Sequence, residues 1–170
     1  TICIVGTSAS KPFSALICDC LPEYHMQANG QCFPLYWYEE KGDLGGIFAS
    51  SEKKYVRHEA ITDQALEIFR KAYPHAFIGR FKKDGGEELN KEDIFYYIYG
   101  ILHSSEYRKR FASNLQKELP RIPLAQDFDV FSKAGRALAE LHLNYESVDP
   151  WPEIVEDGDS ENPGRTEKMK

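Results

Sequence analysis

The stretch DIFYYIYGILHSSEYR, residues 93–108, carries the clearest structural pattern of this sequence. Its apolar residues recur three and four positions apart, as they do along one face of an α-helix. This stripe consists of Ile94, Tyr97, Ile98, Ile101 and Leu102. Asn90 stands before it as a candidate N-cap, with acidic residues in the first turn. The stretch therefore predicts a helix that buries one face.

A second helix is predicted to begin inside the same stretch, at Ser104 or Ser105. Its apolar side would consist of Tyr107, Phe111 and Leu115, packed against the first helix as a pair. This helix must end near Leu119, because Pro120 and Pro123 follow. The residues between the two prolines are predicted to form an extended linker.

Helical patterns also lie on both sides of this pair. Upstream, Thr62 can cap a short amphipathic helix that Pro74 ends. Downstream, residues 128–143 present apolar residues on one side of a last helix. Residues 61–146 are therefore predicted to be a helical part with about four helices.

The first 60 residues have a different pattern, that of short strands separated by Gly, Pro, Ser and Asn. The predicted strands are Thr1–Val5, Ala15–Cys18 and Cys32–Tyr38. The predicted fold class is therefore α+β: a β-rich N-terminal half with short mixed or antiparallel strands in residues 1–60, followed by a helical C-terminal half.

The net charge of −6 is unevenly distributed along the 170 residues. Residues 1–60 carry 5 basic and 7 acidic groups, residues 61–126 carry 11 and 9, and residues 127–170 carry 5 and 11. The acidity is concentrated at the C-terminal end, where residues 147–170 are predicted to be an acidic, mostly disordered tail. The overall charge therefore says little about whether the rest of the chain binds nucleic acid.

The sequence has no apolar run near the roughly 20 residues that a membrane-spanning helix needs, and no charged leader before an apolar stretch. We therefore expect a cytoplasmic protein with no membrane partner. Because the chain begins with Thr1 rather than Met, we also expect it to be part of a longer polypeptide.

Common catalytic motifs are absent from the sequence: there is no GxxxxGK[ST] phosphate loop, no GxSxG elbow and no HExxH helix. We expect no enzymatic activity from this chain alone. Four residues, Cys18, Cys20, His25 and Cys32, offer zinc ligands for a metal-dependent hydrolase, but their spacing is poor. The favoured interpretation is reduced, partly buried cysteines and no metal.

Histidine and tyrosine side chains of the helical half invite functional interpretations as well. His103 and His142 are candidate bases, and the tyrosines between residues 96 and 99 could stack on nucleic-acid bases. Their helical spacing favours histidines satisfied in a core or interface, and tyrosines packed in the core.

Basic residues near predicted loops are the candidate nucleic-acid contacts, because such loops often carry binding groups. Arg and Lys side chains there can contact phosphates or the guanine edge in the major groove. The candidate DNA-binding residues are Lys11, Lys53, Lys54, Arg57, His58, Arg80, Lys82 and Lys83.

Several motifs in order along the chain resemble the C-terminal specificity region of type ISP restriction-modification enzymes. They are KPFSALI (11–17), QCFPLY (31–36), DIFYYIYGILHSSEYR (93–108), LPRIPL (119–124) and LAELHLNY (138–145). Enzymes of this family are large bacterial proteins that join a nuclease, a helicase-like ATPase motor, an adenine-N6 DNA methyltransferase and a target-recognition domain.

The resemblance implies that this chain is a DNA target-recognition fragment without a catalytic residue or cofactor of its own. Its partners would be double-stranded DNA and the methyltransferase domain of the same polypeptide. The parent enzyme would use S-adenosylmethionine, ATP and magnesium. The alternative is a structural module that docks on the methyltransferase and makes little direct contact with DNA.

Overall fold

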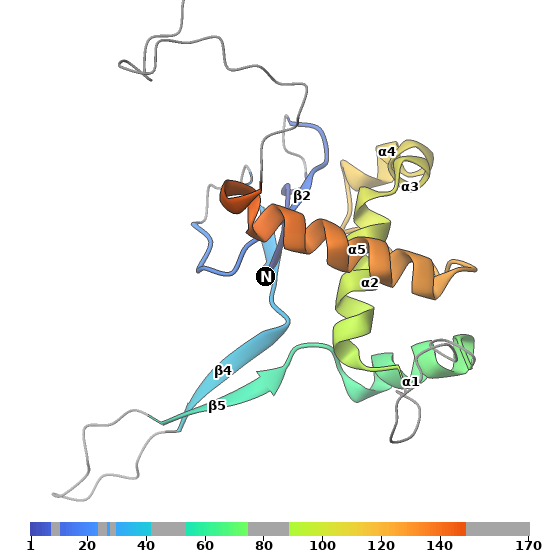
Figure 1. Cartoon of the computed structure of the whole chain (residues 1–170). Helices are drawn as coiled ribbons and strands as arrows, with labels where there is room; N and C mark the ends of the chain where they lie inside the picture. The colour runs from blue at the N-terminus through green and yellow to red at the C-terminus, as the bar shows by residue number, and fades with distance from the viewer. Residues whose placement is uncertain (8–10, 24–26, 28–29, 42–53, 75–88, 149–170) are drawn as a thin grey trace, which may run out of the picture.

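A computed structural model describes residues 1–7, 11–23, 27, 30–41, 54–74 and 89–148. Two small antiparallel sheets come first along the chain and helices follow, so the predicted α+β class is confirmed (Figure 1). The candidate residues Lys53, Arg80, Lys82 and Lys83 lie outside the described residues, as does the predicted tail from residue 149 onward.

The first sheet has three antiparallel strands in the order β2-β1-β3. Its central strand β1 (Ile2–Ile4) pairs with β2 (Ala15–Ile17) on one side and with β3 (Gln31–Phe33) on the other. All three residues of β1 are buried, because an apolar run such as Ile-Cys-Ile suits a central strand covered on both faces. This sheet forms the N-terminal part of the core.

The second sheet is a two-stranded ribbon of β4 (Tyr36–Lys41) and β5 (Lys54–Glu59). Figure 1 shows that it projects away from the helices. The prediction of one strand over 32–38 is wrong, because the chain leaves the first sheet after Phe33 and enters the ribbon at Tyr36. Pro34 lies at the break, and proline lacks the N–H that a continuous ladder needs.

Three helices confirm the pattern that the sequence shows. Helix α1 (Asp63–Ala72) begins after Thr62, whose hydroxyl accepts from the amide of Ala65. Helix α2 (Lys91–His103) begins with a capping box, in which Asn90 and Asp93 bond each other's backbone N–H. Helix α5 (Phe128–Leu143) is the longest at 16 residues. A short 3₁₀ turn, η1 (Tyr145–Ser147), follows it.

The predicted helix from Ser104 to Leu119 is divided in the structure. Helix α3 (Ser105–Arg110) and helix α4 (Ala112–Leu115) are separated by Phe111, whose backbone leaves the helical region at φ −108° and ψ 17°. The ring of Phe111 lies 5.1 Å from that of Tyr107, centroid to centroid. The described part of the chain therefore has five α-helices rather than about four.

Helices α2 and α5 cross each other (Figure 1). Two glycines, Gly100 and Gly135, lie at the crossing. A Cβ on Gly135 would collide with the carbonyl oxygen of Tyr96 and lie 2.7 Å from the amide nitrogen of Gly100. A Cβ on Gly100 would likewise collide with the backbone of Phe131. The two helix backbones can approach this closely only because neither position carries a side chain.

Hydrogen bonds around this crossing satisfy the buried polar groups. The Ser132 hydroxyl donates to the carbonyl oxygen of Asp93 at 3.0 Å, and Arg136 donates to Glu92 at 2.8 Å. The Tyr97 hydroxyl donates to the carbonyl oxygen of Pro123 at 2.6 Å and accepts from the amide of Ala125 at 2.8 Å. The proline-bracketed linker is therefore tied to α2.

Strands β1 and β2 and the helices share one hydrophobic core. Its members include Ile2, Ile4, Ala15 and Ile17 from the sheet and Ile94, Tyr97, Tyr99 and Ile101 from α2. Core packing of Tyr97 and Tyr99, the favoured interpretation of the sequence, is confirmed. Within the described ranges, no helix is both long enough and apolar enough to cross a membrane.

Replacing Gly135 with Ala should destabilise the fold by about 1–3 kcal/mol or more, because the added methyl group pushes backbone against backbone. Urea unfolding of the two proteins measures the difference. Lys133→Ala is the matched control, since Lys133 is exposed on the same helix. Equal stability of Gly135→Ala and wild type would contradict the close crossing.

Candidate nucleic-acid interface

The described candidate residues lie on two different elements. Lys54, Arg57 and His58 are part of strand β5, and Lys11 is exposed in the segment before β2. The expectation that Lys54, Arg57 and His58 cluster around a loop is wrong, because β5 pairs with β4 over its whole length. The structure therefore places three of the candidates on a paired two-stranded ribbon.

The pairing register determines which face of the ribbon each side chain occupies. Tyr38 pairs with Arg57 and Trp37 pairs with His58, and neighbouring pairs point to opposite faces. One face thus carries Tyr36, Tyr38, Glu40, Tyr55, Arg57 and Glu59. The other face carries Trp37, Glu39 and His58 among others. Arg57 and His58 are consequently on one element but not on one surface.

On each face of the ribbon, an aromatic ring contacts one of the candidate side chains, Arg57 or His58. The guanidinium carbon of Arg57 lies 4.4 Å from the centroid of the Tyr36 ring. The His58 ring stacks on Trp37 at 4.4 Å, with 20° between the planes. The same His58 ring is 3.1 Å from a carboxylate oxygen of Glu39. These contacts orient the side chains while leaving them at the surface.

Exposed aromatic rings are the feature of the ribbon that the sequence analysis missed. Trp37, Tyr38 and Tyr55 are 46%, 62% and 55% exposed. Their signal is present in the sequences YWYEEK and KYVRHE, but it becomes a surface only when the two strands are paired. A two-stranded ribbon fits the major groove of DNA, and exposed rings and an arginine can contact bases or sugars there.

The base of the ribbon is tied to the helices by Lys91 at the start of α2. Its ammonium group lies 2.8 Å from Glu59 on β5 and 2.6 Å from Asp63 on α1. Hydrogen bonding to the two carboxylates raises the pKa of Lys91, and the bond to Lys91 lowers the pKa of Asp63. This ion-pair group connects three elements at the point where the ribbon joins the helical half.

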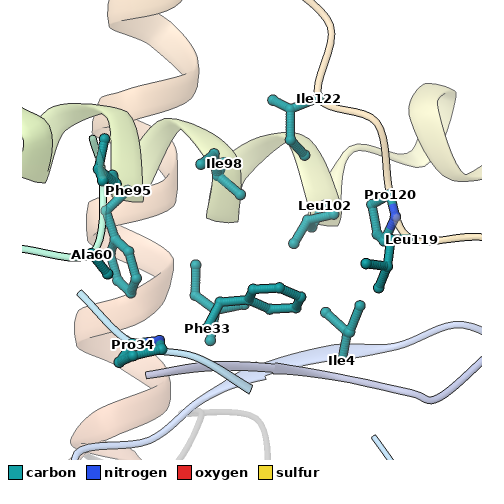
Figure 2. A pocket seen from close by; sticks show the side chains of 12 residues that line it. Ile4, Phe33, Pro34, Ala60, Phe95, Ile98, Leu102, Leu119, Pro120 and Ile122 are labelled. Atoms are coloured by element: carbon teal, nitrogen blue, oxygen red, sulfur yellow. The ribbon is translucent and has the colours of Figure 1, made fainter. Parts of the chain in front are cut away.

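A pocket of about 310 Å³ lies beside the same joint (Figure 2). The first sheet and the ribbon base contribute Ile4, Phe33, Pro34 and Ala60, and the helical half contributes Phe95, Ile98, Leu102 and Ile122 among others. All of its lining residues are apolar. The pocket thus has no side chain for acid-base or nucleophilic chemistry.

His103 and His142, the described histidines of the helical half, are half-buried and both contact Tyr99. His142 Nδ1 lies 2.6 Å from the Tyr99 hydroxyl, and His103 Nδ1 donates to the Tyr99 carbonyl oxygen at 3.1 Å. Burial raises the pKa of Tyr99 to about 12 and lowers the pKa of His103. The geometry gives these groups a structural role.

Of the four zinc ligands considered from the sequence, the structure describes the three cysteines Cys18, Cys20 and Cys32. His25 lies outside the described residues, and Cys20 is exposed. Cys18 and Cys32 instead gather around Cys3, which the zinc hypothesis did not include. No group of three or more His, Cys, Asp or Glu residues that could hold a metal occurs in the part of the chain that the structure describes.

Comparisons with known proteins identify relatives for the whole chain. The family model described as the type ISP C-terminal specificity domain matches residues 1–170. A search of curated proteins finds no match.

Three solved structures match with high similarity. The DrdV–DNA complex, determined by cryo-electron microscopy, has a TM-score of 0.68 and 36% identity and covers 89% of this chain. A nuclease-deletion mutant of the type ISP restriction-modification enzyme LlaGI, in complex with a DNA substrate mimic, has a TM-score of 0.61, 32% identity and 88% coverage. The ATP-dependent type ISP restriction-modification enzyme LlaBIII bound to DNA has a TM-score of 0.65 and 30% identity and covers 88% of this chain. This chain spans 12%, 10% and 8% of those three chains, respectively.

The half-buried His103 should make stability depend on pH. Its pKa in the folded state is below the ordinary value of 6.5, so the unfolded chain binds a proton more readily. Folding stability should therefore fall as the pH drops below about 6.5. Urea unfolding between about pH 5 and pH 8 measures this loss. His103→Asn should show a smaller loss, and an unchanged pH dependence in that variant would contradict the assignment.

Proposed function

Because this chain belongs to the family of type ISP C-terminal specificity domains, we propose that it recognises a specific sequence in duplex DNA. In this role it positions the adenine-N6 methylation and the cleavage carried out by other domains of a large restriction-modification polypeptide. The three similar structures, each a complex with DNA or a DNA substrate mimic, support the proposal.

The observation that carries the proposal is the β4–β5 ribbon, which projects from the helices (Figure 1). Its rings Trp37, Tyr38 and Tyr55 are exposed. Strand pairing fixes the register of the ribbon, and the ion pair of Glu59 with Lys91 ties its base to the helices. A preorganised element of this kind loses less conformational entropy on binding than an unpaired loop would. Arg57 is held over Tyr36 on the same face as Tyr38 and Tyr55. That face therefore offers the planar guanidinium group of Arg57 as a hydrogen-bond donor to guanine, next to the hydroxyl-bearing rings of Tyr38 and Tyr55.

The remaining candidate residues are proposed to bind the phosphate backbone. Lys11, Lys53 and Lys54, together with Arg80, Lys82 and Lys83, supply positive charge. Phosphate contacts determine register and orientation on the duplex, while base contacts determine sequence. His58, stacked on Trp37, is proposed to contact DNA from the second face of the ribbon.

We propose that residues 1–60 and 61–146 act together as one recognition domain, because strands and helices share a core. The parent polypeptide is proposed to be a cytoplasmic enzyme that uses S-adenosylmethionine, ATP and magnesium in its other domains. Residues 147–170 are proposed to be an acidic, mostly disordered tail.

A second candidate function is docking on the methyltransferase domain with little direct contact to DNA. Exposed apolar side chains on and after α5 favour it: Val130, Leu141, Tyr145 and Val148. Such side chains gain from burial against another domain. Docking and DNA recognition predict opposite outcomes for the ribbon variants below.

In the full-length enzyme, Arg57→Ala should relax sequence preference at one or two base pairs. The loss of a bidentate arginine–guanine contact costs about 1–3 kcal/mol of discrimination. Sequencing of methylated adenines in DNA modified by the variant measures the preference. Arg121→Ala is the control, because Arg121 is an exposed arginine of the linker that pairs with Glu118. An unchanged methylation motif with Arg57→Ala and Tyr38→Ala combined would favour docking.

Replacing Arg80, Lys82 and Lys83 together with Ala should instead weaken DNA binding nearly uniformly across sequences. For each phosphate that the variant no longer neutralises, the slope of log affinity against log salt should become shallower by about 0.9. Titrations of specific and unrelated duplexes at several salt concentrations test this. An unchanged salt slope would show that these three residues do not contact DNA phosphates.

A further inference from the structure

Three of the four cysteines gather on one face of the three-stranded sheet. The sulfur of Cys32 lies 3.2 Å from that of Cys3, and the sulfur of Cys18 lies 3.7 Å from it. Ile2 and Ile4 line the apolar pocket beside the helices, so Cys3, which lies between them on β1, points to the opposite face of the sheet. These three thiols are therefore separate from the pocket and from the ribbon.

The backbone register shows how Cys3 and Cys32 face each other. Thr1 and Cys18 exchange two backbone hydrogen bonds: the N-terminal amino group of Thr1 donates to the carbonyl oxygen of Cys18, and the amide of Cys18 donates to the carbonyl oxygen of Thr1. The amide of Val5 likewise donates to the carbonyl oxygen of Ser14. Residues 1, 3 and 5 thus direct their backbone groups toward β2. On the β3 side, the Cys3–Cys32 pair is consequently one without backbone hydrogen bonds between its members.

This type of pair has the geometry that a disulfide needs. Its Cα atoms are separated by about 4.5 Å, within the range of about 4.4–6.8 Å found for disulfide-bonded residues. Cys18 is placed diagonally to Cys3 rather than opposite it, since Leu16 is the direct partner of Cys3 on β2. Of the two neighbouring thiols, Cys32 is the better placed for a bond to Cys3.

The two thiols differ in their access to solvent. Cys32 is exposed, whereas Cys3 is only 1% exposed. Burial, together with hydrogen bonds to Cys32 and Cys18, raises the pKa of Cys3. An oxidant in solution therefore meets Cys32 first, and Cys3 reacts second from within the sheet.

We propose that Cys3 and Cys32 are a thiol pair that is reversibly oxidised to a disulfide linking strands β1 and β3. The oxidant is a small-molecule disulfide of the glutathione type. The Cys32 thiolate attacks one sulfur of oxidised glutathione and releases one glutathione thiolate. Cys3, after losing its proton, attacks the Cys32 sulfur of the mixed disulfide and releases the second. Two protein thiols are oxidised, and one glutathione disulfide is reduced to two thiols.

The bond would have a mechanical consequence for the ribbon. Strand β3 ends at Phe33, and the chain passes through Pro34 into β4. A disulfide from Cys32 to the central strand would fix the point from which the ribbon starts. Hydrogen exchange at the amides of β3 and the start of β4 should therefore be slower in the oxidised protein. This consequence does not depend on DNA recognition.

The test treats the purified full-length protein with oxidised glutathione and locates disulfides by proteolysis and mass spectrometry without reduction. The expected product is a peptide pair linked through Cys3 and Cys32, which a dithiol reductant separates again. Cys20→Ser is the matched control, because Cys20 is an exposed thiol outside the cluster and its removal should leave the product unchanged. Cys32→Ser should abolish it.

Three outcomes would overturn the proposal. They are a bond between Cys18 and Cys20, a bond between Cys3 and Cys18 in preference to Cys32, or a lasting glutathione adduct on Cys32 without an internal bond. Each can be seen in the wild-type protein alone, so the result does not depend on whether the serine variants fold.

Discussion

The close crossing of α2 and α5 is the contact on which the remaining arrangement depends. Without side chains at Gly100 and Gly135, the two backbones come near enough for Ser132 to bond the backbone of Asp93 and for Arg136 to reach Glu92. The same approach lets the rings of Tyr97 and Phe128 stack at 4.8 Å. Wider spacing would separate all of these partners and leave polar groups of the core unsatisfied.

The crossing is connected to the ribbon through α2. Tyr97 bonds the linker between α4 and α5, and the core around it extends to strands β1 and β2. At the other end of α2, Lys91 joins α1 and β5 by ion pairs. The ribbon thus starts from a base that ion pairs and core contacts tie to α2. Side chains on the ribbon can change without disturbing that base, because most of them face solvent.

Local signals in the sequence were enough to predict the helices but not their close approach. The caps at Thr62 and Asn90 and the apolar stripe of α2 depend only on neighbouring residues, and they appear as expected. The strand break coincides with Pro34, whose missing N–H is itself a local signal. The approach of α2 to α5 depends instead on Gly100 and Gly135, which are far apart in the sequence and which no local pattern pairs. For the same reason, sequence reasoning placed the candidate residues of β5 around a loop, since strand pairing with β4 supplies what their own pattern lacks.

The charge of the chain suits a role in specificity more than in affinity. The ribbon strands carry Glu39, Glu40 and Glu59 against Lys41, Lys54 and Arg57, so they bring little net positive charge to a phosphate backbone. Phosphate neutralisation supplies most of the sequence-independent affinity of DNA-binding proteins. In the proposed function this chain would add a shaped, oriented surface, and the attraction to DNA would come largely from other domains.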